Sequence, residues 1–197
     1  MIILAIESSC DETAVALVRD GREVLTDQVF SQADLHAVYG GVVPEIASRA
    51  HTDAVAEVVE NAVKNAGVSY EELDAVAVTY GAGLLGALLV GVSFAKSFAY
   101  ALNKPLIAVN HIRGHLAAAY LDAPDLKPPF VTLLASGGHT AILYAGSEEK
   151  FDILGATLDD AAGEAFDKVA RVLGLKYPGG PNIEKCILEG KGNPVVP

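Results

Sequence analysis

An internal repeat constrains the fold of this chain more than any other feature. The stretches "IILAIESSCDETAVALVRDG" and "PFVTLLASGGHTAILYAG" share one layout: an apolar strand, a turn rich in Ser, Gly or carboxylates, and a second strand. Each copy continues into a third strand and then a helix, with "DDAAGEAFDKVARVLGL" as the helix of the second copy. A supersecondary unit that occurs twice predicts two related lobes.

The repeat sets the expected domain limits. We expect a first lobe over residues 1–121, a proline-rich linker over 122–129 and an incomplete second lobe over 130–197. In the first lobe a helix opened by Pro44 and closed by Gly67, a buried strand "DAVAVTY", an apolar helix over 84–102 and a strand "PLIAV" follow the meander. The second copy has no such continuation and runs into a Gly-rich loop, "YPGGPNIE". This pattern predicts an α/β protein of the actin-like, hexokinase-like ATPase superfold, in which a nucleotide lies between two lobes.

Composition indicates a folded chain of the cytoplasm. Its residues are 51% hydrophobic and 20% charged, which excludes intrinsic disorder. Cys10 and Cys186 form no disulfide pattern, and the apolar run over 79–95 is shorter than the ~20 residues of a membrane helix. We therefore expect a soluble, cytoplasmic protein without a membrane segment or signal peptide.

The net charge of −11 argues against binding nucleic acid over the whole surface. Basic residues nevertheless gather after position 167: Lys168, Arg171, Lys176, Lys185 and Lys191. This cluster is either a patch that faces RNA or a solvated helix and loop. From this feature alone, the solvated helix and loop is favoured.

The two repeated turns are candidate ligand sites. "SSCDET" places Asp11 and Glu12 where a base or a ligand of metal-bound water is useful, whereas Ser and Asp also favour such turns for structural reasons. "ASGGHT" offers the backbone amides of Gly137 and Gly138 to phosphate oxygens, against the alternative of a plain hairpin turn.

His111 and His115 form the third candidate site. Four residues apart on a helix, they lie on one face and can share a metal ion, or they are ordinary helix residues. Ile112 stands where a zinc protease carries its general base Glu, so a zincin site is disfavoured. A stable site needs further ligands, for which His139, Asp11 and Glu12 are the candidates in the sequence, unless the ligand lies outside this chain.

Taken in order, "ESSCDET", "YGGVVPEIASRAH", "NHIRGH", "SGGHT", "DDAAGEAFDK" and "GLKYPGGP" closely resemble the bacterial TsaD family of tRNA adenosine threonylcarbamoyltransferases. The resemblance runs over the whole chain but covers only the N-terminal part of the family. It implies transfer of a threonylcarbamoyl group from threonylcarbamoyl-AMP to the tRNA adenosine beside the anticodon. It also implies a paralogous scaffold subunit, TsaB, and an ATPase subunit, TsaE, as partners.

The resemblance further implies residue roles. His111 and His115 match metal ligands, the metal being iron or alternatively zinc, with an aspartate near the family's C-terminus as the third ligand, absent here. Asp11 and Glu12 match acidic residues near the reacting group. The positions that match substrate-binding ones are Leu134, Ala135, Ser136, Gly137, Gly138, Asp167, Gly180 and Glu184. Without the rest of the second lobe, we expect this chain to transfer poorly.

Other functions remain as alternatives. A non-catalytic scaffold paralogue of the same complex suits the length, and the helix over 84–102 would supply its contact through Gly86 and Gly91, but the scaffold lacks the histidine pair. A glycoprotein-cleaving metalloprotease is disfavoured further because Arg113 stands where bacterial members carry Glu. Sugar kinases and chaperone ATPases share the superfold but not the "NHxxGH" or "DDAAGEAFDK" motifs.

Overall fold

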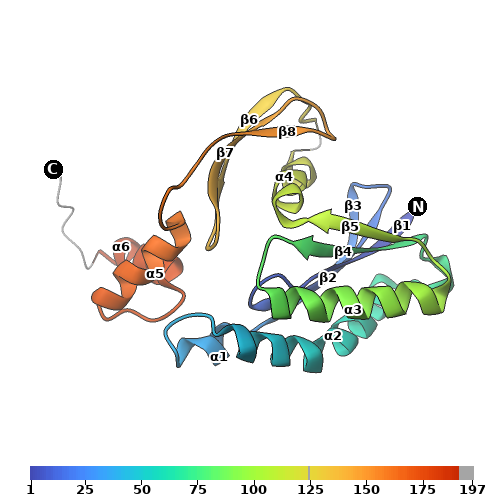
Figure 1. Cartoon of the computed structure of the whole chain (residues 1–197), viewed down its shortest axis with the longest axis horizontal. Helices are drawn as coiled ribbons and strands as arrows, with labels where there is room; N and C mark the ends of the chain where they lie inside the picture. The colour runs from blue at the N-terminus through green and yellow to red at the C-terminus, as the bar shows by residue number, and fades with distance from the viewer. Residues whose placement is uncertain (124, 191–197) are drawn as a thin grey trace. The chain divides into compact units, whose positions relative to one another are not determined.

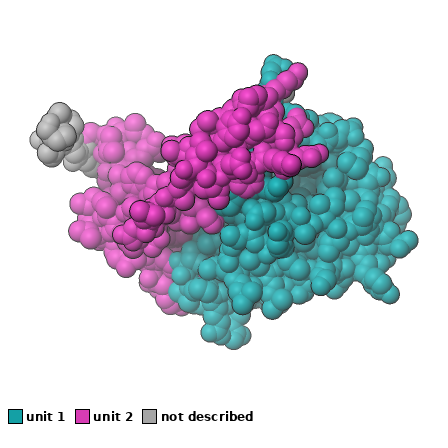
Figure 2. Space-filling view, turned by 45° about the horizontal axis from the view of Figure 1, so that its top comes forward, with its two compact units in different colours: residues 1–32, 42–126 teal, residues 33–41, 127–197 magenta. Residues whose placement is uncertain are grey.

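The computed structural model describes residues 1–123 and 125–190. Two compact units make up the chain, and each is described by itself (Figure 2). Unit 1 comprises residues 1–32 and 42–126, and unit 2 comprises residues 33–41 and 127–197. The lobe limits expected from the sequence, 1–121 and 130–197, stay a prediction.

Unit 1 is built on a five-stranded sheet of order β3-β2-β1-β4-β5 (Figure 1). Its strands are β1 (Ile2–Glu7), β2 (Glu12–Arg19), β3 (Glu23–Ser31), β4 (Ala75–Gly81) and β5 (Leu106–Asn110). The first three strands form an antiparallel meander, as predicted, whereas β4 runs parallel to β1 and β5 runs parallel to β4. The carboxyl ends of β1, β4 and β5 therefore meet at one edge, together with the turn from β1 to β2.

The two faces of this sheet differ in side-chain size. Alternation along the strands directs large aliphatic residues, among them Leu4, Leu17 and Val76, to a face covered by α2 (Pro44–Ala66) and α3 (Leu85–Leu102). These three side chains are fully buried and form the core with the two helices. The opposite face carries small residues, including Ala5 and Ala16, and bears α4 (His111–Asp122) (Figure 1).

Helix α3 packs its small residues inward. A Cβ on Gly86 would collide with Ser48 of α2, and one on Gly91 would collide with Ser8 after β1. Both glycines are thus needed for close packing inside unit 1, and the expectation that they also form a contact with another subunit stays a prediction. By length and composition α3 could cross a membrane, a test that core helices also pass, and its Ala95 and Ala99 lie in the core.

Unit 2 contains the second copy of the repeat. The strands β6 (Phe130–Ala135), β7 (Thr140–Ala145) and β8 (Phe151–Ala156) pair antiparallel in that order, and α5 (Ala162–Val172) follows. The predicted Gly-rich loop "YPGGPNIE" is wrong from Gly179 onward, because α6 (Gly179–Leu188) begins at its glycines. The short helices α1 (Ala33–Ala37) and η1 (Tyr70–Glu72, in unit 1) were not predicted.

Candidate metal and substrate site

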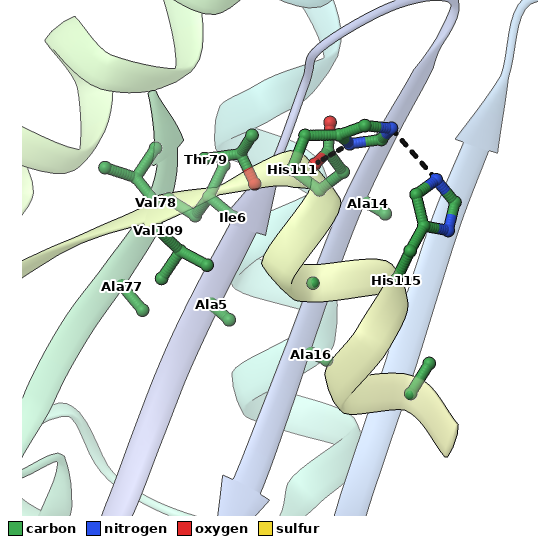
Figure 3. Close-up of a pocket in the computed structure, with 13 residues that line it drawn as sticks. Ala5, Ile6, Ala14, Ala16, Ala77, Val78, Thr79, Val109, His111 and His115 are labelled. Carbon is green, nitrogen blue, oxygen red and sulfur yellow. Dashed lines mark hydrogen bonds and ion pairs between the residues drawn. The ribbon is translucent and has the colours of Figure 1, made fainter. Parts of the chain in front are cut away.

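The histidine pair opens α4 directly behind the carboxyl end of β5. Asn110 ends the strand, and its side-chain oxygen accepts hydrogen bonds from the backbone N–H groups of Ile112 (2.9 Å) and Arg113 (3.4 Å), which caps the helix. The Nε2 atoms of His111 and His115 lie 3.0 Å apart, with the rings at 81° to each other (Figure 3). The sequence prediction that both imidazoles share one helix face is confirmed.

This separation fits a shared metal ion. Two imidazole nitrogens bound to one metal at about 2.0–2.1 Å, at angles of about 90–110°, lie about 2.8–3.4 Å apart. Among the residues that the structure describes, no group of three or more His, Cys, Asp or Glu side chains is arranged to hold a metal. The geometry of the pair thus suits two ligand positions, and within the described part of unit 1 Asp11 and Glu12 do not complete a three-ligand set with it.

Glu7, the last residue of β1, lies behind His111. Its Oε2 is 3.2 Å from His111 Nδ1, the ring nitrogen remote from His115, and Ser9 Oγ is also 3.2 Å from Nδ1. Burial alone would raise the pKa of this carboxyl, but hydrogen bonds from His111, Ser9 and Thr79 outweigh it and lower the pKa to about 2. A carboxylate on the far side of a ligand imidazole is a common arrangement in metal sites.

A buried histidine of α2 forms hydrogen bonds with the turn that carries Asp11. His51 Nε2 is 2.9 Å from the Cys10 carbonyl oxygen, and its Nδ1 is 2.7 Å from Thr13 Oγ1. Both His51 and Thr13 are fully buried. A carbonyl only accepts, so Nε2 carries a hydrogen and, in the neutral ring, Nδ1 accepts from the Thr13 hydroxyl.

Asp11 and Glu12 lie at the same sheet edge as the histidine pair. Asp11 ends the turn and is half-buried, while Glu12 is exposed as the first residue of β2. Because Thr13 points to the α2 face, alternation puts Glu12 on the face of Ala14. This is also the face that bears α4.

A pocket of about 340 Å³ lies between α4 and the small-residue face of the sheet (Figure 3). Its walls are mainly Ala, Val and Gly side chains, including Ala5, Ala77 and Val109, and its polar lining includes Glu7 and the two histidines. The histidine pair therefore borders an apolar space within unit 1.

In unit 2 the "SGGHT" turn lies against the first residues of α5. The N–H of Gly163 donates to the Ser136 carbonyl oxygen (3.1 Å), and the N–H of Ala162 donates to Thr140 Oγ1 (2.8 Å). Gly137 and Gly138 are exposed, with open space where a Cβ would stand, so their backbone is accessible to a ligand. Ala135 is exposed as well, whereas the side chain of Leu134 is buried and belongs to the packing of this unit.

The remaining candidate substrate residues meet at the start of α6. Asp167 Oδ1 accepts a hydrogen bond from the N–H of Gly179 at 2.6 Å. A Cβ on Gly179 would collide with the backbone of Asp167, so the helices approach closely here. Gly180 is the next residue, and Glu184 lies exposed one helical turn further on. The structure thus brings Asp167, Gly180 and Glu184 into one region of unit 2.

The basic cluster is mostly engaged within the chain. Lys168 Nζ pairs with Asp160 (2.5 Å) and Glu164 (3.2 Å), Arg171 donates to the Gly40 carbonyl oxygen (3.0 Å), and Lys185 lies 3.9 Å from Glu189. Lys191 lies outside the described residues. These contacts favour a solvated helix surface over a dedicated RNA patch.

Sequence reasoning did not identify Glu7, Ser9 or His51 as parts of the site. Ser9 and Glu7 stand beside the predicted turn, so the signal was present in "ESSCDET". His51 lies on a helix far along the chain, and only the folded structure brings it to Cys10.

Solved structures with similar folds include YeaZ from Pseudomonas aeruginosa, 20% identical with a TM-score of 0.53, covering 78% of this chain and 64% of that one. A second is component A of the (R)-2-hydroxyglutaryl-CoA dehydratase of Acidaminococcus fermentans, 15% identical with a TM-score of 0.57, covering 100% of this chain and 61% of that one. At these identities the likeness concerns the fold alone, and it supports the predicted ATPase superfold.

Sequence relatives are much closer. The tRNA N6-adenosine threonylcarbamoyltransferase of Clostridium perfringens is 59% identical over 194 residues, covering 98% of this chain and 57% of the relative. That of Clostridium novyi is 60% identical with the same coverage. The chain therefore spans a little over half the length of these relatives. The family model for TsaD, tRNA N6-adenosine threonylcarbamoyltransferase, matches residues 23–197. The chain belongs to the TsaD family.

Proposed function

We propose that the protein of which this chain forms part is a tRNA adenosine threonylcarbamoyltransferase. The exocyclic amine of the adenosine beside the anticodon attacks the carbamoyl carbon of threonylcarbamoyl-AMP. A C–N bond forms, the bond from that carbon to the AMP oxygen breaks, and the proton of the amine passes to a nearby carboxylate or to water while AMP leaves as the phosphate anion. The family match and the 59% identity to such transferases support this proposal.

His111 and His115 are the proposed ligands of one metal ion, iron or alternatively zinc, and their Nε2 atoms 3.0 Å apart support this role. Such an ion would polarise the carbamoyl oxygen and stabilise the charge that develops on it. Asp11 and Glu12, at the same edge of the sheet, are the proposed acidic groups beside the reacting amine. Neither role requires a covalent intermediate, because AMP is already a good leaving group.

The proposed substrate-binding residues lie in unit 2. The exposed amides of Gly137 and Gly138 suit phosphate oxygens, with Ser136 shaping the turn and Leu134 and Ala135 leading into it. A ribose and the groups next to it are the proposed ligands of Asp167, Gly180 and Glu184. Asp167 uses one carboxylate oxygen for the hydrogen bond from Gly179, and its second oxygen can accept from a ribose hydroxyl.

The proposed partners are tRNA, the scaffold subunit TsaB and the ATPase subunit TsaE, and the proposed location is the cytoplasm. The acidic net charge of −11 and the internally paired Lys168 and Lys185 support a tRNA contact that depends on a partner or on the rest of the protein.

The observation that carries the function is the histidine pair in a TsaD chain. The test is transfer by the whole protein, with TsaB and TsaE, from threonylcarbamoyl-AMP to an unmodified tRNA, followed by mass spectrometry of the nucleosides. We expect threonylcarbamoyl-adenosine from the wild type and a loss of at least about 100-fold in the His111→Ala, His115→Ala double variant.

Two outcomes contradict the proposal. Absence of product from the whole wild-type protein, under conditions in which a known transferase is active, would favour the scaffold alternative. Cleavage of a glycoprotein that disappears with His111→Ala would instead revive the metalloprotease.

A further inference from the structure

The contact between Glu7 and His111 fixes which nitrogen of each histidine carries a hydrogen. Glu7 is firmly held at the end of β1, because the Ser9 N–H donates to its Oε1 and the Thr79 hydroxyl donates to the same carboxylate. Its Oε2 lies 3.2 Å from His111 Nδ1. A carboxylate only accepts hydrogen bonds, so the hydrogen between them belongs to Nδ1.

Ser9 does not change this assignment. Its hydroxyl is also 3.2 Å from Nδ1, and it could in principle donate to a bare nitrogen. That arrangement would turn the lone pair of Nδ1 toward the Glu7 carboxylate, and two acceptors facing each other repel. The Ser9 oxygen therefore shares the Nδ1 hydrogen as a second acceptor.

The assignment of the hydrogen to Nδ1 also determines the state of Nε2 of His111. A neutral imidazole carries one N–H, so a hydrogen on Nδ1 leaves a lone pair on Nε2 of His111. The 3.0 Å contact between the two Nε2 atoms then needs its hydrogen from His115. To offer its own Nε2 lone pair to a cation as well, His115 would have to carry its hydrogen on Nδ1 instead, as the other neutral tautomer.

We propose that Glu7 is a positioning residue that holds His111 as the Nδ1–H tautomer, so that its Nε2 lone pair is preset for a divalent cation shared with His115. The inference deepens the metal site of the proposed function and rests on it for the cation. The tautomer itself is independent of any cation. A metal-ligating histidine that donates its other N–H to a carboxylate gains basicity and a fixed ring orientation.

The first test needs no variant and no metal. Long-range ¹H–¹⁵N NMR of the ¹⁵N-labelled 197-residue chain at pH 8 reports the tautomer of each histidine, and His111→Gln and His115→Gln give the assignments. We expect hydrogen on Nδ1 of His111 and on Nε2 of His115. A hydrogen on Nε2 of His111, alone or with Nδ1, overturns the proposal.

The second test measures cation affinity with Zn²⁺ or Ni²⁺ by calorimetry. Glu7→Ala and Glu7→Gln should weaken binding by about 10–100-fold, and Glu7→Ala should also abolish the Nδ1–H preference of His111. Glu57→Gln, an exposed residue of α2, is the control with the same change in charge and should bind as the wild type does. The ¹H–¹⁵N spectrum of each variant verifies that it is folded.

Together the two tests distinguish a failure of the role of Glu7 from a failure of the metal site. Unchanged affinity in both Glu7 variants, while His115→Ala loses binding, overturns the role of Glu7 and leaves the metal site intact. Unchanged affinity in His111→Ala and His115→Ala overturns the metal site, while the tautomer of His111 still decides whether Glu7 positions the ring.

Discussion

Cys10 illustrates how the β1–β2 turn shapes the chemistry of a single residue. Although Cys10 is exposed as a residue, partial desolvation of its thiol within the turn and the neighbouring Asp11 carboxylate raise the pKa of Cys10 to about 12. A raised pKa means that the neutral thiol persists through pH 10, and only the thiolate is nucleophilic. In a Cys186→Ser background, the rate of alkylation by iodoacetamide should therefore still rise with pH above pH 9, where an ordinary thiol of pKa ~8.5 levels off.

Asp11→Asn provides the control for this prediction, because it removes the nearby negative charge while keeping the shape of the side chain. It should raise the alkylation rate of Cys10 at pH 8. A rate profile that levels off near pH 8.5 in the wild-type turn would show that the thiol is not shielded in this way.

His51 stabilises the turn through two buried contacts, with Thr13 and with the Cys10 carbonyl oxygen. His51→Ala leaves a cavity and removes the partners of the buried Thr13 hydroxyl and the Cys10 carbonyl. The free energy of unfolding should fall by about 2–4 kcal/mol, measured by urea denaturation. Thr13→Val, which keeps the bond to Cys10, should cost less. A loss below about 1 kcal/mol in His51→Ala would contradict the network.

At the scale of elements, the approach of α5 to the "SGGHT" turn depends on one glycine. A Cβ on Gly163 would lie 2.7 Å from Gly137 Cα and 2.8 Å from the Ser136 carbonyl oxygen, and backbone atoms have little freedom to withdraw. Gly163→Ala should therefore displace the turn and, if the proposed substrate site is correct, weaken binding of an adenylate to the whole protein at least about 10-fold, as measured by calorimetry. Gly155→Ala, with open space around the new methyl, is the matched control.

The sequence predicted elements whose signals are local. The helix from Pro44 to the left-handed Gly67 and the repeated meander follow from caps, alternation and turn residues. Helix α6 was missed because Gly179 and Gly180 are poor helix formers, and the Asp167 carboxylate that accepts from the first N–H comes from another helix. The histidine pair could be predicted because its spacing is local. Glu7 stands in a motif that the sequence analysis singled out, but its role could not be predicted, because its partner His111 is far away in the chain.

At the scale of the whole molecule, the two units differ in how completely their apolar side chains are buried. Unit 1 has a continuous core in which Leu4, Leu17 and Val76 are completely buried. In unit 2 the three-stranded sheet leaves Leu133 69% and Ile153 63% exposed, and buried side chains such as Leu143 are few among the described residues. Apolar surface on this scale normally contacts further protein, so we infer that unit 2 depends on additional chain or on a partner for its stability.

Hydrogen exchange should therefore divide this 197-residue chain into two levels of protection. Amides of β1 and β4 should exchange only through global unfolding, whereas those of β7 should exchange through local opening, with protection factors lower by at least about 100-fold. The measurement is residue-resolved exchange by NMR at neutral pH. In the whole protein, the β7 amides should approach the protection of β1 because the exposed face is then covered. Equal protection of β1 and β7 in the 197-residue chain would mean that it unfolds as one cooperative unit, and the exposed apolar face of unit 2 would then cost the chain little stability.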